Sequence, residues 1–187
     1  TVTITDRNGC TASDQVTITV MPPIMLTTTP VVYAGGYNIT CNGASDGAID
    51  LGVTGGEVPY AYSWSGPSGY TSAVQDISGL RAGTYTVIVT DANNCTATTT
   101  VVLIEPAVLT LGKTPDVVLA CFGDATATGS FSVSGGTSPY VLAATSNTAG
   151  ASVTITGTSL SFTGGAAGEV TALVTDANGC TTQATIT

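Results

Sequence analysis

Apolar and polar residues alternate with a period of two along several short segments of the chain. Residues 47–54 place Ile49, Leu51 and Val53 on one side, and residues 84–90 show the same alternation. Alternation of this kind is typical of antiparallel strands that bury one face. The pattern predicts strands at 24–32, 47–54, 59–65, 72–77, 84–90 and 95–104, with a weakly marked strand near 68–71.

Turn motifs between these strands recur along the chain. The motif Thr-Asp-x-Asn-(Gly/Asn)-Cys occurs at 5–10, 90–95 and 175–180, at a constant offset of 85 residues. Aspartate, asparagine and glycine in this order favour a tight turn between two strands. The three copies therefore predict three successive repeats of one structural unit.

A second pair of landmarks fixes the boundaries of the repeats. Cys-x-Gly followed by Gly-Gly-x-x-Pro-Tyr occurs at 41–60 and again at 121–140, and residues 23–27 resemble residues 106–110. We expect the sequence to be part of a longer tandem array. Its predicted parts are the C-terminal strands of one repeat at 1–23, a complete repeat at 24–106 and a third, diverged repeat at 107–187.

The composition supports an all-β fold. The chain has 36 threonines, 20 valines and 10 isoleucines among its 187 residues, and β-branched residues suit strands better than helices. About seven short strands in roughly 80–85 residues is typical of an immunoglobulin-like β-sandwich. The predicted fold is an extended array of tandem immunoglobulin-like β-sandwich repeats.

Aromatic residues in the complete repeat fall on one face of a strand. Tyr60, Tyr62 and Trp64 alternate with small residues, and Tyr85 lies in the strand at 84–90. An aromatic platform for sugar is one interpretation. A sandwich keeps its tryptophan in the core, so we assign all four residues to the core instead.

The complete repeat resembles the SprB repeat family. The resemblance rests on four ordered motifs: Cys-Asn-Gly-Ala-Ser-Asp-Gly (41–47), Gly-Gly-x-x-Pro-Tyr-x-Tyr-x-Trp (55–64), Ile-Ser-Gly-Leu-x-Ala-Gly-Thr-Tyr-Thr-Val (77–87) and Val-Thr-Asp-Ala-Asn-x-Cys (89–95). In the third repeat it is partial, because Leu142 and Ala144 stand where the motif has Tyr and Trp. The resemblance implies a very long, secreted protein on the outer surface of a Bacteroidetes cell, exported by the type IX system and serving adhesion or gliding motility.

The charges and the missing histidine exclude several classes of function. The chain has no histidine, three basic residues and twelve acidic ones, with a net charge of −9. Nucleic-acid binding needs a basic surface, and a serine or cysteine nucleophile needs a nearby base. The longest purely apolar run, at 117–122, has six residues, too few to insert into a membrane. We therefore expect no enzymatic activity, no cofactor, no nucleic-acid partner and no membrane insertion.

The sequence offers candidate ligands for one metal, calcium. Asp6, Asp91 and Asp176 each precede amide or glycine residues, and calcium binds carboxylate and amide oxygens. One carboxylate per repeat is too few for a calcium cage, whereas aspartate commonly caps a hairpin turn. We assign all three aspartates to turns and predict no metal site.

The five cysteines predict disulfides, because an extracellular chain is oxidised. Pairing within repeats would join Cys41 to Cys95 and Cys121 to Cys180. In an immunoglobulin-like unit, however, these cysteines lie a strand length apart, about 23 Å for seven residues at about 3.3 Å each. A disulfide needs Cα atoms within about 7 Å. Where two units stack end to end, Cys41 comes close to Cys180, so this pairing is favoured and the pairing within repeats is the alternative. Under the favoured pairing, Cys10, Cys95 and Cys121 bond to other units.

These observations together predict a structural role. We expect a stalk or filament segment of a large secreted bacterial surface adhesin, which acts as a spacer and carries tension. Its partners would be neighbouring repeats of the same chain. The alternative is a module that binds surface glycans or other surface proteins through its loops.

Overall fold

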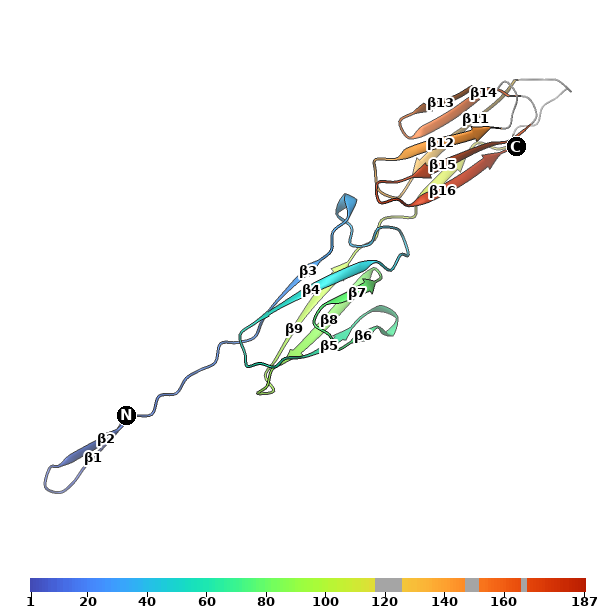
Figure 1. The fold of residues 1–187 in the computed structure, drawn as a ribbon. Coiled ribbons are helices and arrows are strands. Elements are labelled where there is room, and N and C mark those ends of the chain that lie inside the picture. Colours follow the sequence, from blue (N-terminus) through green and yellow to red (C-terminus); the bar gives the residue numbers. More distant parts are fainter. Residues whose placement is uncertain (117–125, 147–151, 166–167) are drawn as a thin grey trace.

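The computed structural model describes residues 1–116, 126–146, 152–165 and 168–187. It is built almost entirely of antiparallel strands, so the predicted all-β fold is confirmed. A hairpin, an extended linker and two β-sandwiches follow one another along a single axis (Figure 1). Within the described ranges, no helix has the length and apolar character needed to cross a membrane.

Residues 1–23, the first unit, contain a single hairpin. Strands β1 (Val2–Thr5) and β2 (Thr11–Asp14) pair with Val2 opposite Asp14. The second unit pairs Val87 with Thr99, which is the same register shifted by 85 residues. Residues 1–23 are all solvent-exposed. This hairpin is therefore the equivalent of the last two strands of the second unit, without a sandwich around it.

The second unit is a sandwich of two sheets. The first sheet has the strand order β3-β4-β7 and the second has the order β6-β5-β8-β9. The strands are β3 (Met25–Pro30), β4 (Gly47–Thr54), β5 (Ala61–Ser65), β6 (Thr71–Ser72), β7 (Ile77–Leu80), β8 (Gly83–Thr90) and β9 (Thr96–Leu103), with short 3-10 helices η1 (Ala34–Gly36) and η2 (Pro67–Gly69).

The strand predicted at 72–77 is wrong. The structure has η2 and β6 in this region, where β6 pairs with β5, and the strand that pairs with β4 is β7. Both Ile77 and Leu80 are buried, three positions apart, because Gly79 adopts a φ of 70° and bulges out of the ladder. A bulge breaks the two-residue period, so alternation alone could not locate this strand.

The core of the second unit surrounds Trp64. Its side chain is buried, and its indole N–H donates to the carbonyls of Val74 (3.0 Å) and Gln75 (3.2 Å). These bonds satisfy the one polar atom of the ring, as a buried tryptophan requires. The other core residues are Ile39, Ile49, Leu51, Ile77, Leu80, Tyr85, Val87, Val89 and Leu103.

The four aromatic residues assigned to the core differ in their burial. Trp64 and Tyr85 are fully buried, and the Tyr85 hydroxyl donates to the carbonyl of Arg81 (3.1 Å), two residues before β8. This is the tyrosine corner of immunoglobulin-like folds. Burial is the main reason that the pKa of Tyr85 is raised. Tyr60 and Tyr62 are only half-buried and pack on the edge of the core.

The third unit is also a sandwich, but its strands divide differently. One sheet has the order β10-β11-β14-β13 and the other the order β12-β15-β16. The strands are β10 (Thr110–Lys113), β11 (Ala127–Ser134), β12 (Val141–Ser146), β13 (Ser152–Thr156), β14 (Ser159–Gly165), β15 (Val170–Thr175) and β16 (Thr181–Ile186). In the second unit the strand after β5 pairs with β5 itself, whereas β13 pairs with β14 across the sandwich.

The core of the third unit is filled by different residues. Ala144 stands at the position of Trp64, and two phenylalanines on the other sheet, Phe131 and Phe162, supply the missing volume. A Cβ on Gly129 would lie 2.4 Å from the Phe162 ring, so this glycine makes room for it. The third unit keeps the sandwich fold because large side chains on one sheet fill the space that the tryptophan of the other sheet fills in the second unit.

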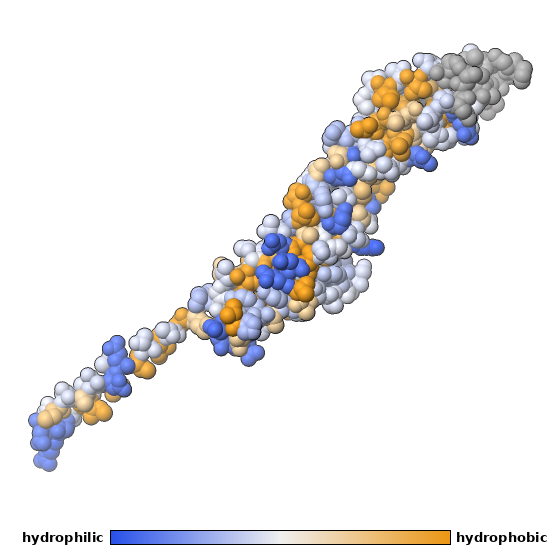
Figure 2. Space-filling model, viewed as in Figure 1, coloured by the Kyte–Doolittle hydropathy of each residue, from blue (hydrophilic) through white to orange (hydrophobic). Residues whose placement is uncertain are grey.

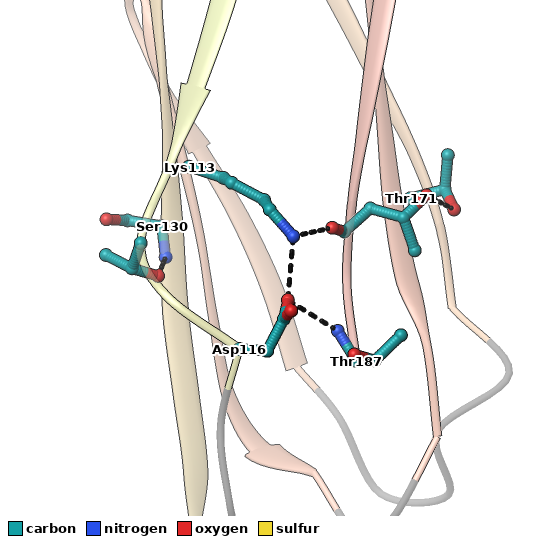
Figure 3. A network of polar contacts seen from close by, with 7 residues as sticks. Lys113, Asp116, Ser130, Thr171 and Thr187 are labelled. Atoms are coloured by element: carbon teal, nitrogen blue, oxygen red, sulfur yellow. Dashed lines mark hydrogen bonds and ion pairs between the residues drawn. The ribbon is translucent and has the colours of Figure 1, made fainter.

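The first and last strands of the third unit are joined by polar contacts (Figure 3). The Lys113 ammonium donates to the carbonyl of Thr185 (2.6 Å) and pairs with Asp116 (2.7 Å). The carboxylate of Asp116 also accepts the backbone N–H of Thr187 (3.3 Å). The Lys113 hydrogen bond is the main cause of the lowered pKa of Asp116. These bonds connect the β10 end of one sheet to the β16 end of the other.

In the second unit a buried asparagine makes the equivalent connection. The Asn38 amide donates to the carbonyl of Val31 (2.8 Å), and its side-chain oxygen accepts the N–H of Ile104 (3.0 Å). The Asn38 N–H in turn donates to the Ile104 carbonyl (2.9 Å). The residues that follow β3 and β9 are thereby held together where the chain leaves the unit.

Candidate functional site: the joint between the second and third units

The turn between β15 and β16 is built by one aspartate. Asp176 accepts the backbone N–H groups of Asn178 and Cys180 on the same carboxylate oxygen, both at 2.9 Å. The turns that begin at Asp6 and Asp91 contain the same two bonds at 2.8–2.9 Å. The three aspartates predicted to form turns thus hold the asparagine and cysteine of each motif in one conformation.

In the turns that begin at Asp91 and Asp176, the second carboxylate oxygen binds the neighbouring loop. Asp176 accepts the N–H of Thr137 (2.9 Å), and Asp91 accepts the N–H of Glu57 (3.1 Å). Burial by itself would raise the pKa of Asp91, but the N–H groups of Cys95, Glu57 and Asn93 together lower it below its ordinary value. The carboxylate therefore stays ionised and holds the turn and loop as one rigid surface, which we call the entry pole.

The linker that enters each unit lies against the same pole. The N–H of Gly56 donates to the Pro22 carbonyl and the N–H of Gly136 to the Ala107 carbonyl, both at 2.9 Å. A Cβ on Gly135 would lie 1.9 Å from the Val108 carbonyl oxygen, so only glycine permits this approach. These contacts show that residue 22 occupies the same structural position as residue 107, at an offset of 85 residues. The alignment of residues 23–27 with 106–110 is therefore wrong by two positions, because it followed apolar residues rather than main-chain contacts.

The opposite end of the second unit, its exit pole, is formed by the loop 31–46 between β3 and β4. Asp46 fixes this loop by accepting the N–H (3.2 Å) and the hydroxyl of Thr40. The Tyr33 hydroxyl donates to the carbonyl of Asp46 (2.9 Å). The loop thus has a defined shape that presents Cys41 to the following unit.

The exit pole of the second unit is bonded covalently to the entry pole of the third. Cys41 and Cys180 form a disulfide with a Cα–Cα distance of 5.7 Å. Of the two pairings considered from the sequence, the structure contains the one between units. Cys10 and Cys95 are exposed free cysteines, and Cys121 lies outside the described residues.

Asn178 adds a set of hydrogen bonds across the joint. Its side-chain oxygen accepts the N–H of Ala34 (3.1 Å), and its amide donates to the carbonyls of Ala34 (3.3 Å) and Thr40 (3.2 Å). The same amide donates to the Thr137 hydroxyl (3.2 Å). The sequence motif predicts this asparagine only as part of a turn. Its place two residues before the bonded cysteine was the available signal.

The linker between the two units is held as well. The N–H of Gly43 donates to the Glu105 carboxylate (2.7 Å), and the Asn42 amide donates to that carboxylate (3.1 Å) and to the Pro106 carbonyl (3.0 Å). A cavity of about 170 Å³ remains beside the disulfide and this linker. It is smaller than the roughly 300–1,000 Å³ of small-molecule sites, so the joint is a packed connection.

Comparison with known proteins identifies one segment of the chain. Residues 37–69 match the model of the SprB repeat family, and the resemblance inferred from the motifs is confirmed there. The match indicates a surface adhesin-like protein of the Bacteroidetes kind. The crystal structure of murine CEACAM1b aligns with 79% of this chain and 94% of its own, at 13% identity and a TM-score of 0.31. No curated protein matches the sequence.

Proposed function

We propose that this chain, whose residues 37–69 match the SprB repeat, is a stalk segment of a large, secreted bacterial surface adhesin. It acts as a spacer that carries tension between a cell and whatever the adhesin binds, in attachment or gliding motility. It has no catalytic activity of its own, and its partners are neighbouring repeat units. The segment lies outside the cell on the outer surface, where disulfides persist.

The double connection at the joint carries this proposal. The peptide linker 104–109 and the Cys41–Cys180 disulfide both run from the second unit to the third. A single short linker lets two domains pivot, whereas a second covalent connection at a different point removes most of that freedom. A spacer benefits from this because a stiff chain holds its end at a fixed reach.

The molecular surface suits an extended array. Figure 2 shows apolar and polar residues in small, interspersed patches along the visible face of all three units. Twelve acidic residues against three basic ones give neighbouring molecules a like charge. Like charge keeps such a chain from associating with copies of itself.

Small-angle X-ray scattering of the 187-residue chain tests the stiff joint. We expect the wild-type chain and a Cys95→Ser control to share one extended particle shape in solution. Cys41→Ser should broaden the distribution of distances between the second and third units, because only the linker and hydrogen bonds then connect them. A wild-type chain that already samples many bend angles would contradict the spacer proposal.

A glycan-binding module is the second candidate. A hollow of about 260 Å³, near the lower end of the roughly 300–1,000 Å³ of small-molecule sites, lies between η2 and β8 and is lined by Tyr70 and by Arg81, the one basic residue of the second unit. An aromatic ring beside a guanidinium suits an acidic sugar. A glycan array decides between the candidates. Specific retention that Arg81→Ala abolishes would support binding, and no retention would leave the spacer.

A further inference from the structure

We propose that the turn between β8 and β9, with Asn93 and Cys95, is a docking site for the cysteine-bearing loop of another repeat unit. That loop is the equivalent of residues 31–46, and it belongs to the unit that precedes β3. The site accepts loops of differing sequence because it binds their main chain. This inference rests on the proposed tandem array, but it assigns a second joint and a rule for its recognition.

The first observation is that the same turn is already docked elsewhere in this structure. Asn178 and Cys180 contact the second unit, and Asn93 and Cys95 are their equivalents at an offset of 85 residues. Asp91 holds Asn93 and Cys95 by bonds of 2.9 and 2.8 Å, as Asp176 holds its own pair at 2.9 Å. The unoccupied turn therefore presents the same two groups in the same conformation.

The second observation concerns the hairpin that precedes the site. Val2 and Ile4 are 66% and 69% exposed, whereas their equivalents Val87 and Val89 are fully buried in the second unit. Val16 and Ile18 further along are exposed in the same way. An apolar strand face of this kind is buried in a complete sandwich. The missing cover is the earlier strands of the same repeat unit.

The linker places that unit on the entry pole of the second unit. Pro22 accepts the N–H of Gly56 just as Ala107 accepts the N–H of Gly136. Met21 thus stands where Pro106 stands in the other joint, next to the docked loop. Asn93 donates to the Met21 sulfur (3.3 Å), and a thioether is a weak acceptor that main-chain carbonyls readily replace.

Main-chain recognition explains how one site fits diverse units. At the observed joint, Asn178 binds the N–H and carbonyl of Ala34 and the carbonyl of Thr40, with no side-chain atom of the loop involved. Any loop with this backbone shape offers the same three groups. Besides the cysteine and the Asn42 contacts with the linker, side-chain identity matters at one more place. Glu57 occupies the position of Thr137, whose methyl group lies 2.8 Å from where a Cβ on Gly35 would sit. The loop that docks on Glu57 must therefore leave room for a carboxylate.

The covalent step balances as an ordinary thiol–disulfide exchange. Cys95 and the loop cysteine lose two protons and two electrons, and one S–S bond forms between them. A protein or small-molecule disulfide of the extracellular medium accepts the electrons and is reduced to two thiols. Cys95 is exposed, so such an oxidant reaches it before the units close.

Disulfide mapping of the protein purified from its source tests the proposal. After digestion without reduction, we expect the Cys95 peptide linked to a peptide from a Cys-x-Gly loop of the preceding unit. A free Cys95, or Cys95 linked to Cys10 of another turn, would overturn it. Either result would leave the Cys41–Cys180 bond and the proposed stalk standing. Absence of the Cys41–Cys180 bond would instead count against the stalk.

Variants of the source protein give an independent test. Cys95→Ser should expose one new thiol, in the preceding loop, to a maleimide label. Asn93→Ala should raise the fraction of unpaired Cys95 several-fold, because the loop is no longer held beside it. Thr98→Ala, an exposed change on β9 of the same unit, is the matched control and should have no effect. Equal labelling of wild-type protein and the Cys95→Ser variant would contradict the docking site.

Discussion

At the residue scale, single polar side chains decide how the units connect. Asn178 forms four hydrogen bonds at the joint, three of them to the main chain of the preceding unit. Glycines decide how closely the linker approaches, since Gly135 adopts a φ of 70° beside the Val108 carbonyl. These positions carry the joint although none of them belongs to either hydrophobic core.

Asn178→Ala should weaken the joint without unfolding either unit. Each lost hydrogen bond costs roughly 1 kcal/mol, and about 1.4 kcal/mol corresponds to a factor of ten. We expect Cys41–Cys180 to become about tenfold or more easier to reduce in a glutathione titration of the 187-residue chain. Gln183→Ala, an exposed change on β16, is the control. An unchanged titration for Asn178→Ala would mean that the disulfide alone sets the joint.

Gly135→Ala should destabilise the third unit more than an alanine at a comparable glycine. Both Gly135 and Gly157 have positive φ, which costs an L-residue roughly 1–2 kcal/mol. The added Cβ at Gly157 meets no atom within 4 Å, whereas at Gly135 it would lie 1.9 Å from a carbonyl oxygen. Hydrogen exchange of the β11 amides should show that Gly135→Ala lowers the free energy of unfolding of the third unit by about 3 kcal/mol or more. Equal losses would show that the close approach is not needed.

At the element scale, the strands could be predicted where alternation is unbroken. The strand at 47–54 has the predicted bounds, and β8 and β9 begin or end within one residue of theirs. The strand β7 was missed because the bulge at Gly79 hides its period. Of the contacts at the joint, only the disulfide could be predicted from the sequence. Asn178 and Glu105 act between units, and contacts between units leave no periodic signal in one strand.

The turn that starts at Asp91 should make the second unit sensitive to acid. Its carboxylate has a lowered pKa in the folded chain because three backbone N–H groups donate to it and outweigh the effect of burial. A group with a lowered folded pKa stabilises the fold above its ordinary pKa, about 3.9, and loses this contribution as the pH falls through the lowered value. The free energy of unfolding should therefore decrease below about pH 4.

Fluorescence of Trp64, the single tryptophan, reports the unfolding of the second unit alone. In urea titrations from pH 6 to pH 2, Asp91→Asn should lower stability at pH 6 and reduce the loss at low pH. Asp50→Asn, on the exposed side of β4, serves as the control and should keep the wild-type pH dependence. If Asp91→Asn kept the wild-type dependence of stability on pH, the turn would not be a cause of the sensitivity to acid.

At the scale of the whole molecule, the disulfide changes the path that tension takes. Cys41 and Cys180 are separated by 139 residues of sequence, and both sandwich cores lie almost entirely between them. Tension applied to the chain ends runs through β3, crosses the S–S bond and leaves through β16. The residues between the two cysteines are excluded from the pull, so the chain cannot lengthen by unfolding them.

Force spectroscopy of the chain held by its two ends measures this directly. At about 3.4 Å per residue, 139 residues correspond to about 470 Å of extended chain. The oxidised chain should stop extending about 470 Å short of the reduced chain, whereas Cys95→Ser should behave as the oxidised wild type. Cys180→Ser should restore the full extension without reductant. Equal extension before and after reduction would show that the bond does not carry the load, and the spacer would then depend on the strength of its individual units.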